Sequence, residues 1–179
     1  MPSFKAEEYL AQISRALGGC DAEIDHLFTG LRRVSSAGGR VFILGNGGSL
    51  AIAQHLAQDF LKLCDVKAMA ITCPSIITAY SNDDGFEFCF FNPVLKLAEK
   101  GDAVLIFSCS GKSRNYIEFV SGFQPMGVKL FAIIGCDGGF LMEKTDGRVH
   151  VRSNDYQVCE TAFCVIADIL VKSFLELKG

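Results

Sequence analysis

The segment VFILGNGGSLAIAQHL, residues 41–56, indicates the fold of this chain. Its first four residues are apolar and lack the alternation of a strand that is exposed on one face. Such a run is typical of a parallel strand that is covered on both faces. The glycine-rich turn leads into a pattern of apolar residues at helical spacing, which begins near Ser49. The segment therefore predicts a strand, a tight turn and a helix.

Similar short apolar runs alternate with helical patterns along the rest of the chain. The predicted strands are residues 41–44, 68–72, 103–108, 129–135 and 148–152, and the last of these alternates like an edge strand. The predicted helices are residues 4–17, a second from Asp21 that ends before Gly38, 49–63, 86–99, 113–125 and 156–177. This order predicts an α/β three-layer fold with two N-terminal helices before the sheet. In such folds ligands bind at the carboxyl ends of the strands.

The composition excludes several classes of protein. The chain has 179 residues, a net charge of −3 and no run of Lys and Arg, so we expect one domain and no nucleic-acid partner. Its apolar runs are too short to span a bilayer and its charged N-terminus is unlike a secretory signal, so we expect no membrane association. Eight cysteines without a CxxC pair indicate buried free thiols in a reducing compartment. We therefore expect a cytoplasmic protein.

Three polar stretches are expected to follow predicted strands. GNGGS, residues 45–49, offers backbone N–H groups and a serine at a helix start, which suits either an anion or a simple helix cap. It lacks the spacing of a dinucleotide turn or a P-loop, so we expect no nucleotide cofactor. FSCSGKS, residues 107–113, places three serines before a helix, and two such loops in one sheet favour phosphate binding. YSNDDGFE, residues 80–87, contains turn formers that could also bind sugar hydroxyls.

Taken in order, these motifs resemble the sugar isomerase (SIS) domain family, and within it most of all the phosphoheptose isomerases. The resemblance rests on GNGGSLAIAQHL, YSNDDGFEF, SCSGKS and IGCDGGFL, and it covers nearly the whole chain. It implies a single SIS domain over residues 1–179, with an N-terminal helical pair at 1–37 and an α/β core at 38–179. It also implies a flavodoxin-like, five-stranded parallel sheet, and a homotetramer with active sites between subunits.

The resemblance implies how a phosphosugar would be bound. The phosphate would lie on the serine loop, and the sugar would contact the glycine turn and the third polar stretch. The implied substrate-binding residues are Asn46, Gly47, Ser49, Asp83, Ser108, Cys109, Ser110 and Ser113. Cys109 stands where the family has threonine, and Lys112 stands where it has asparagine. Lys112 could add a charge at the phosphate or simply be solvated.

Two predicted helices carry a candidate metal set. His55 and Asp59 are four residues apart, so they share one helix face, as two ligands of an ion or as a plain hydrogen-bonded pair would. In the family this histidine binds zinc, and the position of Asp59 is normally glutamate. Glu160 and Asp168 stand where the family has glutamine or glutamate and histidine. An aspartate in the apolar run around residue 168 needs a partner if it is buried. The resemblance therefore implies zinc or another divalent ion on these four residues.

The implied activity is the aldose–ketose isomerisation of a phosphosugar, from sedoheptulose 7-phosphate to a heptose 7-phosphate through an enediol. This reaction needs a base near the reacting C–H bond and a group that stabilises the oxyanion. The candidate catalytic residues are His55, Asp59, Glu160 and Asp168, with Asp59 or Glu160 moving the proton. Two alternatives stay open: a phosphosugar-binding or scaffold SIS protein without catalysis, and another phosphosugar isomerase or lyase.

Overall fold

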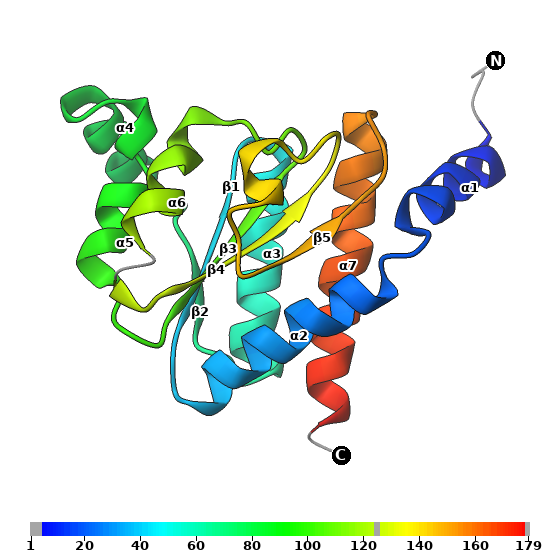
Figure 1. The fold of residues 1–179 in the computed structure, drawn as a ribbon, viewed down its shortest axis with the longest axis horizontal. Coiled ribbons are helices and arrows are strands. Elements are labelled where there is room, and N and C mark those ends of the chain that lie inside the picture. Colours follow the sequence, from blue (N-terminus) through cyan, green and yellow to red (C-terminus); the bar gives the residue numbers. More distant parts are fainter. Residues whose placement is uncertain (1–4, 124–125, 178–179) are drawn as a thin grey trace.

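The computed structural model describes residues 5–123 and 126–177 as a parallel sheet with helices on both faces (Figure 1). In this part of the chain the sheet has five strands in the order β2-β1-β3-β4-β5, and each neighbouring pair is parallel. The strands are β1 (Val41–Gly45), β2 (Ala68–Ala70), β3 (Ala103–Ser108), β4 (Lys129–Ile134) and β5 (Gly147–His150). This is the flavodoxin-like order, and β5 is the expected edge strand.

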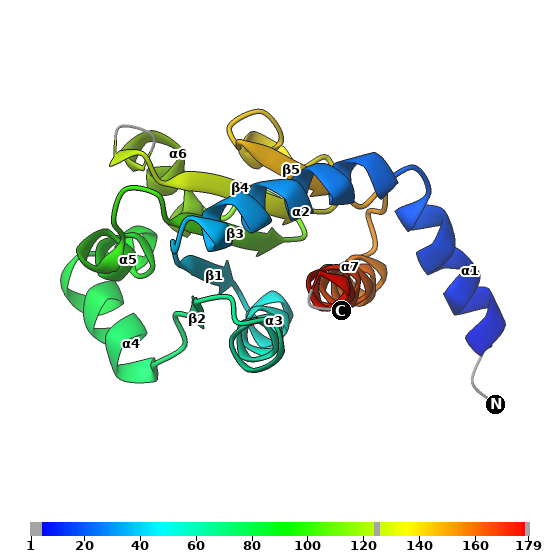
Figure 2. The same cartoon turned by 90° about the horizontal axis from the view of Figure 1, so that it is seen from below.

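Helices cover the two faces of the sheet and make the three predicted layers (Figure 2). The α-helices are α1 (Ala6–Leu17), α2 (Asp21–Ser36), α3 (Gly48–Leu63), α4 (Pro74–Asp83), α5 (Phe91–Leu97), α6 (Ile117–Gly122) and α7 (Tyr156–Glu176). Short 3-10 helices are η1 (Phe86–Phe88), η2 (Arg114–Tyr116) and η4 (Gly139–Met142). Alternate residues of β1 enter different cores: Ile43 packs with α2, α3 and α7, and Leu44 packs with α5 and α6.

The register of the central strands brings two loops together. Gly45 at the end of β1 pairs with Phe107, one residue before the end of β3. Both strands are buried along their whole length, which explains their continuous apolar sequences. The glycine turn and the serine loop therefore leave the sheet side by side at its carboxyl edge.

Connections between the strands differ from the sequence-based expectation. Helix α4 was not predicted, because none of its residues is fully buried and only Ile77 and Tyr80 pack against the core from its inner face. The stretch 80–87 therefore does not directly follow a strand, since it comprises the end of α4 and most of η1. The single helices predicted over 86–99 and 113–125 are each a 3-10 turn followed by a shorter α-helix. Residues 124–125 lie outside the described residues.

Helix α1 extends to one side of the sheet and packs against α7 (Figures 1 and 2). The Tyr9 hydroxyl lies 3.1 Å from Thr161 Oγ1 on α7. No helix within residues 5–123 and 126–177 combines the length and the apolar character that crossing a membrane requires. The expectation of buried thiols is wrong for Cys73 and Cys164, which are exposed.

Candidate active site

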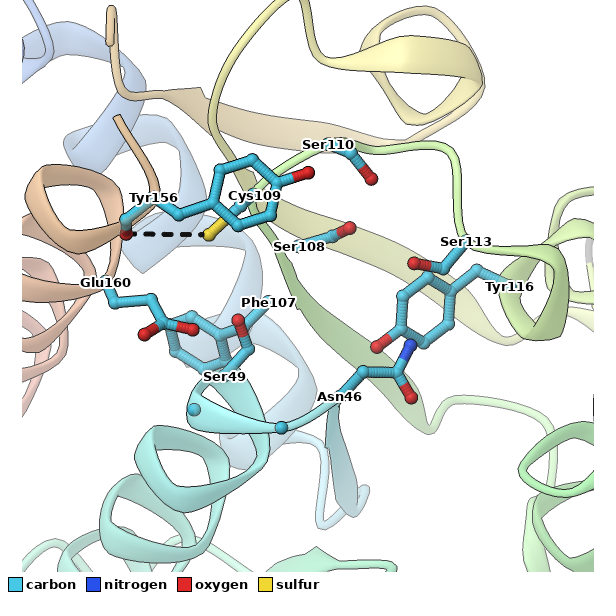
Figure 3. A pocket seen from close by; sticks show the side chains of 12 residues that line it. Asn46, Ser49, Phe107, Ser108, Cys109, Ser110, Ser113, Tyr116, Tyr156 and Glu160 are labelled. Carbon is cyan, nitrogen blue, oxygen red and sulfur yellow. Dashed lines mark hydrogen bonds between the residues drawn. The ribbon is translucent and has the colours of Figure 1, made fainter. Parts of the chain in front are cut away.

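A pocket of about 320 Å³ opens at the carboxyl ends of β1 and β3, beside the start of α7 (Figure 3). This is the edge at which the sequence predicts ligand binding. The pocket is lined by the glycine turn, the serine loop, η2 and the start of α7: Asn46, Gly47, Gly48, Ser49, Phe107, Ser108, Cys109, Ser110, Ser113, Tyr116, Tyr156 and Glu160. All predicted substrate-binding residues except Asp83 belong to this lining.

Glycines shape the turn between β1 and α3, whose backbone forms part of the pocket wall. Gly47 has φ +55° and ψ −124°, a backbone conformation that side chains other than glycine's rarely adopt. Helix α3 begins at Gly48, and Ser49 is buried just behind it. A Cβ on Gly48 would collide with the carboxylate of Glu160, so this carboxylate lies directly against the start of α3. A negative charge is favoured at this end of a helix by the helix dipole.

Asn46 is held by a second asparagine. Asn46 Nδ2 donates to Asn115 Oδ1 at 3.0 Å, and Asn115 Nδ2 donates to Asn46 Oδ1 at 2.9 Å. Asn115 is fully buried, so the reciprocal pair satisfies an amide that would otherwise be costly to bury. The pair therefore fixes the orientation of the Asn46 amide at the pocket wall.

The serine loop is braced by its own hydrogen bonds. Ser108 Oγ accepts a hydrogen bond from the Gly111 amide at 3.1 Å, and Ser110 Oγ accepts one from the Lys112 amide at 3.2 Å. Figure 3 shows the hydroxyls of Ser108, Ser110 and Ser113 turned towards a common space. Each hydroxyl can still donate its hydrogen, so the loop presents three donors to an anion.

The serine loop is also tied to the loop that follows β4. Gly111 approaches Gly138 so closely that a Cβ on Gly111 would collide with the Gly138 carbonyl oxygen. Lys112 Nζ lies 2.6 Å from Asp137 Oδ2, which raises the pKa of Lys112 and lowers that of Asp137. Lys112 thus pairs with a carboxylate in this structure. Glu160 is the one carboxylate among the lining residues, which include no aspartate, lysine, arginine or histidine.

Cys109 lines the pocket as a neutral thiol. Its Sγ lies 3.9 Å from the carbonyl oxygen of Tyr156 (dashed line in Figure 3). The pKa of Cys109 is raised above its usual range, mainly by a hydrogen bond with the thiol of Cys159 and to a smaller extent by burial. Cys109 therefore offers a substrate a weak hydrogen-bond donor and no thiolate.

The candidate metal residues are not gathered at one point. His55 Nε2 and Asp59 Oδ2 lie 3.5 Å apart on α3, and 65% of the His55 side chain is exposed. Glu160 lines the pocket, whereas Asp168 lies further along α7 and is exposed, so the apolar run does not bury it. Within the described part of the chain, no three His, Cys, Asp or Glu side chains are grouped so that they could hold a metal ion.

The observed pocket differs from the predicted site: it lacks Asp83 and includes residues that the sequence did not single out. Asp83 is exposed at the end of α4, where its Oδ1 accepts a hydrogen bond from Asn82 at 2.8 Å. The lining residues that the sequence did not single out are Gly48, Phe107, Tyr116 and Tyr156, and it also missed Asn115, which holds Asn46. Helical spacing was the available signal for the two tyrosines, since Tyr116 follows Ser113 by three residues and Tyr156 precedes Glu160 by four. 

Comparisons with known proteins agree with this geometry. The family model described as SIS domain matches residues 6–135. A phosphoheptose isomerase of Geobacter sulfurreducens is 37% identical, over 83% of this chain and 80% of its own length. A second phosphoheptose isomerase, of Trichlorobacter lovleyi, is 32% identical over 95% of this chain and 91% of its own length. The solved structure of a phosphoheptose isomerase from Neisseria gonorrhoeae superposes with a TM-score of 0.88 at 25% identity, covering 94% of this chain and 93% of that one. The chain therefore belongs to the SIS domain family and, within it, to the phosphoheptose isomerases.

Proposed function

We propose that this chain interconverts sedoheptulose 7-phosphate and a heptose 7-phosphate. The observation that carries the proposal is the meeting of three serines and one carboxylate in a single pocket. Serine hydroxyls suit a phosphate, and a carboxylate suits proton transfer. The phosphoheptose isomerases to which the chain is similar supply the substrate class.

The phosphate is proposed to lie on the hydroxyls of Ser108, Ser110 and Ser113. Because these donors belong to one braced loop, they need little rearrangement to meet an anion. The sugar would then extend towards the glycine turn, where Asn46 and Ser49 face the same pocket. Its reacting end would lie near the Glu160 carboxylate.

Glu160 is the proposed proton-transfer residue, because it lines the pocket whereas Asp59 does not. Its carboxylate takes a proton from C1 of the ketose while the C2 carbonyl oxygen gains a proton from solvent, which gives the 1,2-enediol. Glu160 then returns its proton to C2 while the proton on O1 passes to solvent, which gives the aldose. Donors at Asn46 and Ser49 would stabilise the oxygen that carries negative charge between these steps.

A divalent ion, with zinc among the candidates, is a further proposal centred on His55 and Asp59. Glu160 and Asp168 are eight residues apart on α7, which is about 12 Å along a helix axis, whereas the ligand atoms of one ion lie within about 4 Å of each other. In the described part of the chain the four side chains are also not grouped as the ligands of one ion would be, and no step above depends on an ion. Metal analysis of wild type and of His55→Ala tests whether this pair binds an ion.

The homotetramer and the cytoplasmic location are also proposals. Assembly is supported by apolar side chains that are exposed in a single chain, such as Leu10 on α1, Ile76 on α4 and Ile169 on α7. Subunit contacts there would also cover the exposed face of α4 that carries Ile76. The exposed thiols of Cys73 and Cys164 suit a reducing compartment.

An isomerase assay tests the proposed function. Purified protein incubated with sedoheptulose 7-phosphate should form the aldose, which NMR detects by its anomeric proton. Ser110→Ala should raise KM about tenfold or more, because it removes a hydroxyl donor to a charged group. Ser173→Ala, which removes a hydroxyl bonded to the Ile169 carbonyl on α7, is the matched control and should leave KM unchanged. A wild type that binds the ketose but converts none of it, with or without added divalent ions, would favour the phosphosugar-binding alternative.

A further inference from the structure

Tyr116 carries a buried hydroxyl that has no partner. Its side chain has no exposed surface, and among the buried side-chain nitrogen and oxygen atoms of the described residues its hydroxyl alone makes no hydrogen bond. Burying a hydroxyl in this way is unfavourable, and native proteins seldom do so without a reason. An orphaned polar atom at a pocket wall is therefore a candidate for contact with a ligand.

The position of the ring aims this hydroxyl at the pocket. Tyr116 is part of the lining and follows the serine loop directly, in η2. Its ring is stacked on Phe90, with ring centres 6.2 Å apart and planes 9° from parallel, so packing fixes the direction of the C–O bond. Figure 3 shows the hydroxyl pointing inward, into the space bounded by Asn46, Ser49 and the serine loop.

We propose that the Tyr116 hydroxyl is a substrate-binding group that donates a hydrogen bond to an oxygen of the sugar part of the phosphosugar. This inference rests on the proposed function. Three serines already supply donors for the phosphate, whereas a seven-carbon sugar presents an oxygen on nearly every carbon. Burial raises the pKa of the Tyr116 hydroxyl above its usual range, so it stays protonated and acts as a donor.

Tyr116→Phe tests the proposal, because it removes one oxygen and keeps the ring. Without ligand, the variant should melt at the same temperature as wild type or about 2–4 °C higher, since an unsatisfied buried group is lost. Its Kd for sedoheptulose 7-phosphate, measured by calorimetry, should rise roughly three- to tenfold. Its Kd for inorganic phosphate should not change. Tyr9→Phe removes a hydroxyl bonded to Thr161, outside the pocket, and should alter neither Kd.

Each other outcome decides against the inference in a different way. Equal affinity of Tyr116→Phe and wild type for the sugar phosphate would mean that the hydroxyl is merely tolerated, while the proposed function would stand. An equal loss of affinity for inorganic phosphate would assign the hydroxyl to the phosphate instead. A wild type with no affinity for sedoheptulose 7-phosphate would overturn both the inference and the proposed function.

Discussion

Replacing Glu160 by glutamine separates proton transfer from substrate binding. The change keeps the size of the side chain and its hydrogen-bonding reach but removes its basicity. No other lining residue can take over as a base: the serines and tyrosines are neutral, and hydrogen bonding and burial keep the Cys109 thiol protonated. In this chain the reaction should therefore depend on this one carboxylate, although the family has glutamine as well as glutamate at its position.

The expected loss of rate in Glu160→Gln follows from the absence of a second base in the pocket lining. A positioned general base contributes about 10²–10⁴ in rate, so Glu160→Gln should raise the barrier by about 3–5 kcal/mol. KM should change little, because the proposed phosphate contacts are made by the serine loop and not by Glu160. The variant also loses a negative charge at the start of α3, which contributes about 0.3–1 kcal/mol and corresponds to a melting temperature about 1–4 °C lower. The activity would thus be lost from a folded protein.

Two measurements on the same sample check this result. The first is kcat and KM for sedoheptulose 7-phosphate, and the second is exchange of the C1 hydrogen of the ketose with solvent deuterium, which reports proton removal alone. Both should fall together in Glu160→Gln. Glu176→Gln, an exposed change at the far end of α7, should alter neither. A Glu160→Gln variant that keeps more than a tenth of the wild-type kcat would refute the assignment of the base.

The remaining predictions concern the glycine turn and the thiols. Gly48→Ala should leave the melting temperature unchanged or slightly higher, because alanine is the better helix former. The variant should nevertheless lower kcat about tenfold, since its Cβ would take the place of the Glu160 carboxylate. An unchanged kcat would show that the carboxylate can shift freely. Iodoacetamide should alkylate Cys73 well before Cys109, as followed by peptide mass spectrometry. Cys73 is exposed and a hydrogen bond from Ser75 lowers its pKa, whereas Cys109 is buried and its pKa is raised. Equal rates at the two thiols would contradict the burial of Cys109.

Sequence reasoning predicted the sheet well because its central strands obey one simple rule. Residues 41–44 and 103–108 are buried on both faces, so their apolar character is continuous and easy to recognise. No such pattern marks α4, since only two of its side chains, Ile77 and Tyr80, pack against the core and both are half-buried. Asp83, at the end of that helix, was consequently predicted to lie on a loop at the site, and the structure places it on an exposed helix end instead.

Position along the helix axis explains why Glu160 lines the pocket and His55, another member of the predicted catalytic set, does not. Helical spacing states which residues share a face, but it does not state how far along the axis they lie from a ligand. The pocket lies at the starts of α3 and α7, so Ser49 and Glu160, near those starts, reach it. His55 lies seven residues beyond Gly48, about 10 Å further down the axis, and points out into solvent in the single chain. Glu160, in the first turns of α7, is therefore the carboxylate that the fold places in the pocket, whereas a role of His55 would require a metal ion or a neighbouring subunit.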